Sequence, residues 1–141
     1  MPNLPESLPW RSSYATDIPS IDAHQQGLFK VLRLLQEATH DGRVEGELEV
    51  ILEWLERHAR VHFETEETFM RKAGFTGVGQ HAQEHSRFTT HLRHLKRRFE
   101  MGDPQVPSEL ILMLYGWMQD HVLHQDRIFA EHLRIQGKAG R

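Results

Sequence analysis

Histidines on the apolar stripes of the predicted helices constrain this chain more than any other feature of its sequence. The chain has 11 histidines, and no two of them are consecutive. Apolar residues recur at helical spacing in four segments, and at least one imidazole interrupts the stripe in each segment. These histidines are His24, His62, His81, His85 and His121. An unpaired polar group on the inner face of a helix bundle loses its hydration without compensation, so the set requires a common partner.

The apolar stripes also predict the fold. They run from Ser20 to the Asp41-Gly42 turn, from Leu48 through Ile51, Leu55, Ala59 and Phe69 to near Gly74, from Phe88 to Phe99, and from Leu110 to Phe129. No segment alternates with a period of two, so no strands are expected. Helices of about 20 to 28 residues with short connections pack as antiparallel neighbours. We therefore expect an all-α, up-down-up-down antiparallel four-helix bundle with an extended N-terminal arm.

The expected bundle occupies residues 19–136. Residues 1–18 contain prolines and no periodicity, which predicts an arm that Trp10 holds against the surface. Residues 137–141 are expected to form a flexible C-terminal tail. Ser108, just before the fourth stripe, is a candidate cap for the last helix.

Composition restricts both the site and the partners. A length of 141 residues with 38% hydrophobic and 26% charged residues is typical of one soluble globular domain. A net charge of -3 argues against nucleic acid as a partner. No stretch approaches the roughly 18 apolar residues of a membrane span, and the N-terminus lacks signal-peptide features, so we expect a cytoplasmic protein without membrane attachment. Because cysteine is absent, any metal must be bound by nitrogen and oxygen atoms.

The spacing of the inward histidines favours a metal site. His62 with Glu66, and His81 with His85, are four residues apart, so each pair lies on one helix face at about 6 Å and can address one ion or one ion pair. Imidazole with carboxylate suits iron, zinc, copper or manganese. A lone buried histidine is more often a hydrogen-bonded core residue, but the joint pattern over four helices favours a metal. Five further histidines do not complete the pattern and are expected on the surface, namely His40, His58, His91, His94 and His132.

Three segments together resemble the signature of the hemerythrin family, in particular its single-domain bacteriohemerythrins. They are His62-Phe63-Glu64-Thr65-Glu66-Glu67, His81-x-x-x-His85 and Trp117-Met118-x-x-His121-x-x-x-x-Asp126, and the resemblance extends from Trp10 to about Phe129. It implies two iron ions bridged by an oxo or hydroxo group and by the carboxylates of Glu66 and Asp126. One iron would take His81, His85 and His121, and the other would take His62 and a histidine of the first helix.

The resemblance also implies a function, which is reversible binding of dioxygen at the iron with the open position. Oxygen transport, storage, delivery or sensing would follow, without enzymatic turnover and with a separate signalling or oxygen-consuming protein as partner. Trp117 and Met118 are candidates for the apolar lining of the oxygen pocket. The alternatives are a di-iron enzyme (an oxidase, a peroxidase or a nitric-oxide-handling protein) and an iron- or zinc-binding structural module. Ferritin-like oxidases use two Glu-x-x-His motifs, whereas this chain has one, from Glu37 to His40, which favours binding.

The chain departs from the family pattern in its first helix. The family usually has Asp-x-Gln-His there, whereas this chain has Asp22-Ala23-His24-Gln25. A shift of one residue turns a side chain by about 100° around the helix axis. We predict that His24 still binds through a local change of helix register. The alternative is that Gln25 or water takes the position and the second iron is held weakly.

The spacing in the last helix is also irregular. Asp126 lies five residues after His121, which is about 140° around an ideal helix. Asp120 with His124 would be better aligned by spacing alone. A π-bulge would bring Asp126 inward, place Phe129 and Leu133 on the stripe and turn His132 outward, and such bulges favour functional sites. We therefore predict a distortion between His121 and Asp126.

Overall fold

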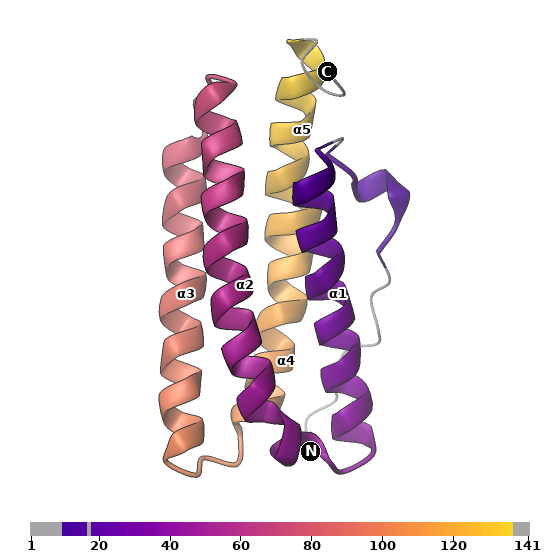
Figure 1. The fold of residues 1–141 in the computed structure, drawn as a ribbon, viewed down its shortest axis with the longest axis vertical. Coiled ribbons are helices and arrows are strands. Elements are labelled where there is room, and N and C mark those ends of the chain that lie inside the picture. The colour runs from indigo at the N-terminus through magenta and orange to yellow at the C-terminus, as the bar shows by residue number, and fades with distance from the viewer. Residues whose placement is uncertain (1–9, 17, 137–141) are drawn as a thin grey trace.

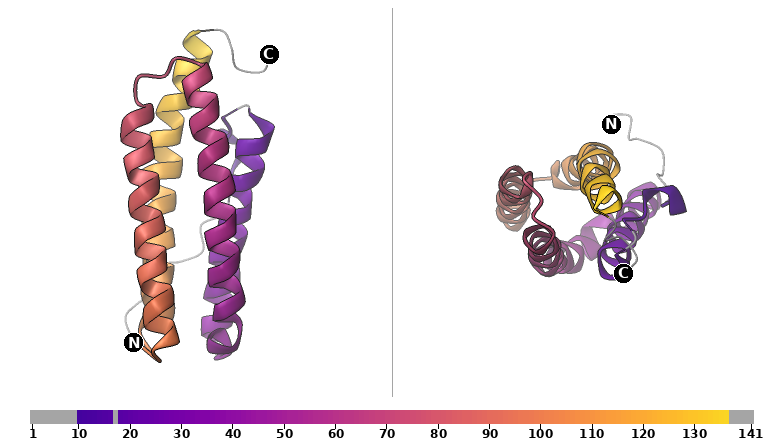
Figure 2. Two further views of the ribbon diagram at one scale, coloured as in Figure 1. Left: turned by 60° about the vertical axis from the view of Figure 1, so that its left-hand side comes forward. Right: turned by 90° about the horizontal axis from the view of Figure 1, so that it is seen from above.

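The four-helix bundle appears directly in the computed structural model, which describes residues 10–16 and 18–136 (Figure 1). Every regular element in this part of the chain is helical, as predicted. The elements are η1 (Ser12–Tyr14), α1 (Pro19–His40), α2 (Val44–Lys72), α3 (Val78–Glu100), α4 (Val106–Trp117), η2 (Met118–Gln125) and α5 (Asp126–Ile135). The last three elements form one continuous rod, and the view from above shows four rods around a common axis (Figure 2).

Glycines in the left-handed region follow the first three long helices. Gly42, Gly74 and Gly102 have φ angles of 73°, 67° and 84°. Glycine adopts this conformation without the steric cost that a Cβ atom imposes, so it closes the helix C-terminus and lets the chain reverse. These turns produce the predicted alternation of helix direction.

The start of the fourth rod differs from the prediction. The helix begins at Val106, with Gln105 at the cap position and Pro107 in the first turn. The backbone N–H of Gln105 donates to Oδ1 of Asp103 at 2.9 Å. The prediction that Ser108 caps this helix is therefore wrong, because the proline-compatible first turn starts earlier and places Ser108 inside the helix.

Aromatic contacts hold the described part of the N-terminal arm to α1. Trp10 is half-buried and meets Tyr14 edge-on with ring centroids 6.4 Å apart, and Tyr14 stacks on Phe29 at 6.0 Å. Thr16 is buried, and its N–H and Oγ1 donate to Oδ1 of Asp22 at 2.7 and 2.9 Å. These contacts agree with the role predicted for Trp10. Residues 1–9 of the expected arm and the expected tail 137–141 lie outside the described residues.

The apolar core has two parts with a polar layer between them. The larger part spans all four rods and includes the fully buried Leu35, Leu55, Leu95 and Leu114. The smaller part comprises Ile21, Met70, Ala73, Phe75, Phe129 and Leu133. Helices that bury apolar residues on both sides of a polar layer hold that layer at a fixed height in the bundle.

One predicted core residue lies on the surface. Phe69 is 38% exposed, whereas its neighbour Met70 is fully buried. Met70 lies four residues after the buried Glu66, so it continues the inward row of α2 and turns Phe69 away. No described helix is long and apolar enough to cross a lipid bilayer.

Candidate metal centre

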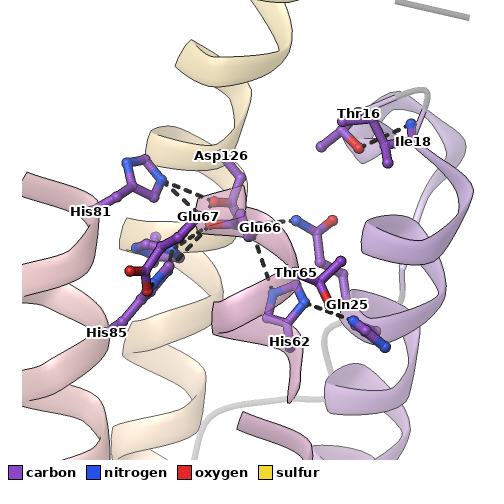
Figure 3. Close-up of polar contacts among 12 residues, drawn as sticks. Thr16, Ile18, Gln25, His62, Thr65, Glu66, Glu67, His81, His85 and Asp126 are labelled. Atoms are coloured by element: carbon purple, nitrogen blue, oxygen red, sulfur yellow. Dashed lines mark hydrogen bonds and ion pairs between the residues drawn. The ribbon is translucent and has the colours of Figure 1, made fainter. Parts of the chain in front are cut away.

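The polar layer consists of buried side chains from all four rods (Figure 3). Its members are Gln25 of α1, His62 and Glu66 of α2, His81 and His85 of α3, His121 of η2 and Asp126 of α5. Each is at most 3% exposed. Ionisable groups are this deeply buried only when they are paired or when they bind a metal.

Imidazoles surround one oxygen of each buried carboxylate, three of them at Glu66 and two at Asp126. Oε1 of Glu66 lies 3.2 Å from Nε2 of His85, 3.5 Å from Nε2 of His121 and 3.6 Å from Nε2 of His81. Oδ1 of Asp126 lies 3.1 Å from Nε2 of His81 and 3.2 Å from Nε2 of His121. Candidate ligand atoms of Glu66, His81, His121 and Asp126 all lie within 4.8 Å of one another. We call this group, with His85, the three-histidine position.

The second oxygen of each carboxylate contacts a residue outside the three-histidine position. Oε2 of Glu66 lies 3.4 Å from Nε2 of His62, and Oδ2 of Asp126 accepts a hydrogen bond of 2.8 Å from Nε2 of Gln25. We call this second group the His62 position. Each carboxylate therefore has one oxygen in each position, which is the arrangement that lets a carboxylate bridge two metal ions.

The predicted ligand His24 does not contact either carboxylate. Its Nδ1 lies 3.2 Å from Nδ1 of His62, and its ring is half-buried. Adjacent residues on a helix diverge by about 100°, so His24 faces α2 while Gln25 faces Asp126 of α5. The geometry favours the alternative that the sequence left open, with Gln25 in the inward position and His24 behind the His62 ring.

The predicted distortion of the last helix is confirmed. Residues Met118–Gln125 form a π-helix, in which the wider turn brings His121 and Asp126 to the same side. Both side chains are at most 2% exposed, and Phe129 and Leu133 are buried as expected. Asp120 is exposed, while the side chain of His124, the other half of the alternative pair, lies outside the described residues.

Two acids outside the predicted set contact the far nitrogens of the histidines. Oε2 of Glu67 lies 2.8 Å from Nδ1 of His85, and Oε2 of Glu84 lies 3.1 Å from Nδ1 of His121. Such a carboxylate accepts the Nδ1–H and leaves the Nε2 lone pair free for a metal. Sequence reasoning missed both acids, although each is adjacent in sequence to a candidate ligand, Glu67 to Glu66 and Glu84 to His85.

Two of the histidines expected on the surface are partly buried, while His40, His91 and His94 are exposed. Nε2 of His58 donates to the backbone oxygen of His24 at 2.8 Å, and the His58 ring stacks on Trp54 with centroids 4.3 Å apart. Burial lowers the pKa of His58 to about 4. His132 is half-buried, with Nε2 lying 3.1 Å from the backbone oxygen of Ala73, so the expected outward turn is incomplete.

The charges in the layer favour a bound cation. Burial opposes ionisation of Glu66, but contacts with the imidazoles of His121 and His85 outweigh it and hold the pKa of Glu66 well below its usual range. Burial likewise opposes protonation of His121, yet Asp126, Glu66 and Glu84 raise the pKa of His121 well above its usual range. The carboxylates of the layer therefore favour positive charge beside them, which a bound metal ion can supply.

Several polar atoms of the layer lack a hydrogen bond of good geometry. They are Oε1 of Gln25, Nε2 of His62, and Oε1 and Oε2 of Glu66. Burial lowers the pKa of His62, which favours the neutral imidazole with a free lone pair on one ring nitrogen. Buried polar atoms without partners are rare in folded proteins, and nitrogen and oxygen donors without thiolate suit iron and related metals. The residues present therefore fit a pair of such ions.

Apolar side chains cover the three-histidine position. The Trp117 ring stacks on His121 with centroids 3.9 Å apart, and the Phe63 ring stacks on His85 at the same distance. Met118 is fully buried in the larger core, next to Trp117 in the chain. The stacked rings restrict the planes of the imidazoles of His121 and His85 and place apolar surface beside them.

Comparison with known proteins agrees with this geometry. The family model described as the hemerythrin HHE cation binding domain matches residues 16–133. A bacteriohemerythrin of Pseudomonas paraeruginosa is 27% identical over 127 residues, which cover 90% of this chain and 82% of that protein. A bacteriohemerythrin of Methylococcus capsulatus is 22% identical over 118 residues, covering 84% and 89% respectively. A third, from Ralstonia nicotianae, is 31% identical over 84 residues, covering 60% and 61%.

Proposed function

Because this chain belongs to the hemerythrin family, we propose that it holds two iron ions in the polar layer and binds dioxygen there reversibly. The observation that carries this proposal is the position of the two carboxylates. Glu66 and Asp126 each have one oxygen beside the three-histidine position and one beside the His62 position. Two adjacent metal positions that share two carboxylates suit a molecule that takes up two electrons.

The donor sets assign a role to each position. His81, His85 and His121 would hold one iron, His62 would hold the other, and the carboxylates would bridge them. When bound, the irons supply electrons that dioxygen accepts on binding and returns on release. The His62 position has fewer imidazoles, and that difference leaves room for the gas molecule there.

The protein's own residues keep the centre ready for this exchange. The low pKa of the Glu66 carboxyl keeps it anionic and able to bridge. Glu67 and Glu84 orient two of the imidazoles from behind. Trp117 and Phe63 exclude water from the three-histidine side, which protects a reduced metal from unwanted oxidation.

Binding rather than turnover is the function we propose. The centre is rich in histidine, and the curated relatives that it resembles carry the name bacteriohemerythrin. Oxygen transport, storage or sensing in the cytoplasm suits such a centre. A separate oxygen-consuming or signalling protein would then use the bound gas or respond to it.

The test is an oxygen cycle on the iron-loaded protein. We would reduce it without air, admit air, then flush with argon, and follow the visible spectrum with iron content measured in parallel. We expect about two irons per chain and a colour that appears with air and disappears under argon. Zinc in place of iron, a single iron, or a colour that bleaches irreversibly would exclude the oxygen-carrier function.

A further inference from the structure

We propose that the side-chain amide of Gln25 is a metal ligand of the His62 position through Oε1, so that the two metal positions of this chain differ in affinity. The inference rests on the proposed function only in that it assumes a metal pair in the polar layer. It adds a ligand type, a neutral amide oxygen, to a site otherwise made of imidazoles and carboxylates.

The first support is the state of the two amide atoms. Gln25 is fully buried, and its Nε2 donates to Oδ2 of Asp126 at 2.8 Å. Its Oε1 is buried without any partner. An unpaired buried amide oxygen lowers stability, and a cation is the partner that the neighbouring carboxylates would attract.

The second support is the shape of the amide. The group is planar, and its nitrogen faces the carboxylates while its oxygen lies on the far side (Figure 3), so a rotation of the amide by about 180° brings Oε1 to the place of Nε2 when a cation binds. The carboxylate oxygen that holds the amide is the one on the side of the His62 position (Figure 3). Among the residues described, the other atoms of that position without a hydrogen bond are Nε2 of His62 and Oε2 of Glu66, which lie 3.4 Å apart. With Oε1 of Gln25, three donor atoms from α1 and α2 that lack a hydrogen bond are thus available beside Oδ2 of Asp126.

The third support is the contact that keeps Gln25 inward. Nδ1 of the neighbouring His24 lies 3.2 Å from Nδ1 of His62, and the backbone oxygen of His24 accepts a hydrogen bond from His58. These contacts tie the His24 side of α1 to α2. Because the next residue on the helix is about 100° away, they leave Gln25 facing Asp126.

The donor sets predict the order of metal binding. The three-histidine position offers three imidazoles, whereas the His62 position offers one imidazole and one amide oxygen. Imidazole binds divalent ions late in the first transition row more strongly than a neutral carbonyl oxygen does. The first ion is therefore expected at the three-histidine position and the second, more weakly, at the His62 position.

The test is a titration of the metal-free full-length protein with Co²⁺ under argon. Visible absorption reports each binding step, and metal analysis after desalting counts the ions retained. For the wild type we expect two steps, with the second weaker by about ten-fold or more. Gln25→Leu should leave the first step unchanged and weaken the second by about a further ten-fold, whereas Gln25→His should strengthen it by a similar factor.

Two further variants keep the result interpretable. Gln83→Leu removes an exposed glutamine of α3 and should titrate as the wild type does. Gln25→Glu retains an oxygen donor, so it should keep the second step even if the leucine variant fails to fold, which circular dichroism would detect.

Three outcomes would overturn the inference: a wild type that binds a single Co²⁺, a wild type whose two steps have equal affinity, or a folded Gln25→Leu variant with an unchanged second step. The last would mean that the amide contributes nothing to the second metal position. Dioxygen takes no part in this titration, so a failed oxygen cycle would exclude the proposed function without deciding the role of Gln25.

Discussion

His24 and His62 meet through their Nδ1 atoms at 3.2 Å. A hydrogen bond between two imidazoles requires one nitrogen to donate and the other to accept, and a donating His62 Nδ1 leaves Nε2 free on the side of Glu66. Histidine ligands usually have a carboxylate, a carbonyl or water behind them. Here a second histidine takes that place, which gives His24 a positioning role.

Replacing His24 should therefore affect one metal position and spare the other. We expect His24→Leu to weaken binding at the His62 position by about ten-fold, because the His62 ring loses its partner. Binding at the three-histidine position should not change. The measurement is the two-step Co²⁺ titration, with His91→Leu as the control because His91 is exposed. Identical titrations for the His24 and His91 variants would refute this role.

Glu84 should have the matching effect on the three-histidine position. Its carboxylate lies 3.1 Å from Nδ1 of His121, and this contact lowers the pKa of Glu84. Glu84→Gln removes the charge, so affinity at the first step should fall by about ten-fold in competition with a chelator. Asp120→Asn removes an exposed charge from the neighbouring rod and serves as the control. An equal loss of metal affinity in both variants would attribute the effect to the overall charge of the protein instead.

The buried His58 predicts a pH dependence of stability. Burial lowers its pKa from 6.5 to about 4 in the folded protein. Between these two values the unfolded chain binds more protons than the folded chain, so stability falls as pH falls through that window. Imidazole NMR of the metal-free protein should show His58 neutral at pH 5.5, a value about midway in that window. His58→Gln should flatten the decrease in unfolding free energy between pH 6.5 and 4, and a His58 that titrates near 6.5 would contradict the prediction.

Gly27 should tolerate a methyl group poorly, because α1 and α2 approach closely there. A Cβ atom at Gly27 would lie 3.2 Å from Cε1 of His58 and 3.4 Å from Cη2 of Trp54. At Gly116 of α4 a Cβ would meet nothing within 4 Å. We expect Gly116→Ala to raise the unfolding free energy by roughly 0.5–1 kcal/mol through helix propensity. Gly27→Ala should gain less or lose stability in the same denaturant titration, and equal gains would show that His58 and Trp54 move aside freely.

The sequence carried enough information for the fold and for the inward position of Asp126. Apolar stripes at helical spacing predict all four rods, because burial of one helix face is the main force that assembles a bundle. The inward position of Asp126 is also predictable. Its five-residue spacing from His121 conflicts with a regular helix, whereas Phe129 and Leu133 continue the apolar stripe beyond it. The conflict between spacing and pattern therefore predicts the π-helix of Met118–Gln125.

The sequence could not decide between His24 and Gln25. Ile21 and Leu28 are seven residues apart on the apolar stripe. Positions 24 and 25 lie between them, and both fall on the same broad face of α1. The choice depends on which neighbouring helix each position meets, α2 for His24 and the fourth rod for Gln25. That is a property of helix packing, which periodicity within one segment does not contain. The contacts of Glu67 and Glu84 depend on tertiary packing in the same way.

The hydrogen bond between Gln25 and Asp126 joins residues 101 positions apart in the chain. During synthesis, α1, α2 and α3 are made before Asp126 is added, so the nascent chain carries several of the imidazoles and Glu66 before it carries the second carboxylate. At about 5 to 20 residues per second, the ribosome takes on the order of seconds to add the residues between α3 and Asp126. The proposed two-metal arrangement would need both carboxylates, so we expect complete metal loading only after the last helix has left the ribosome.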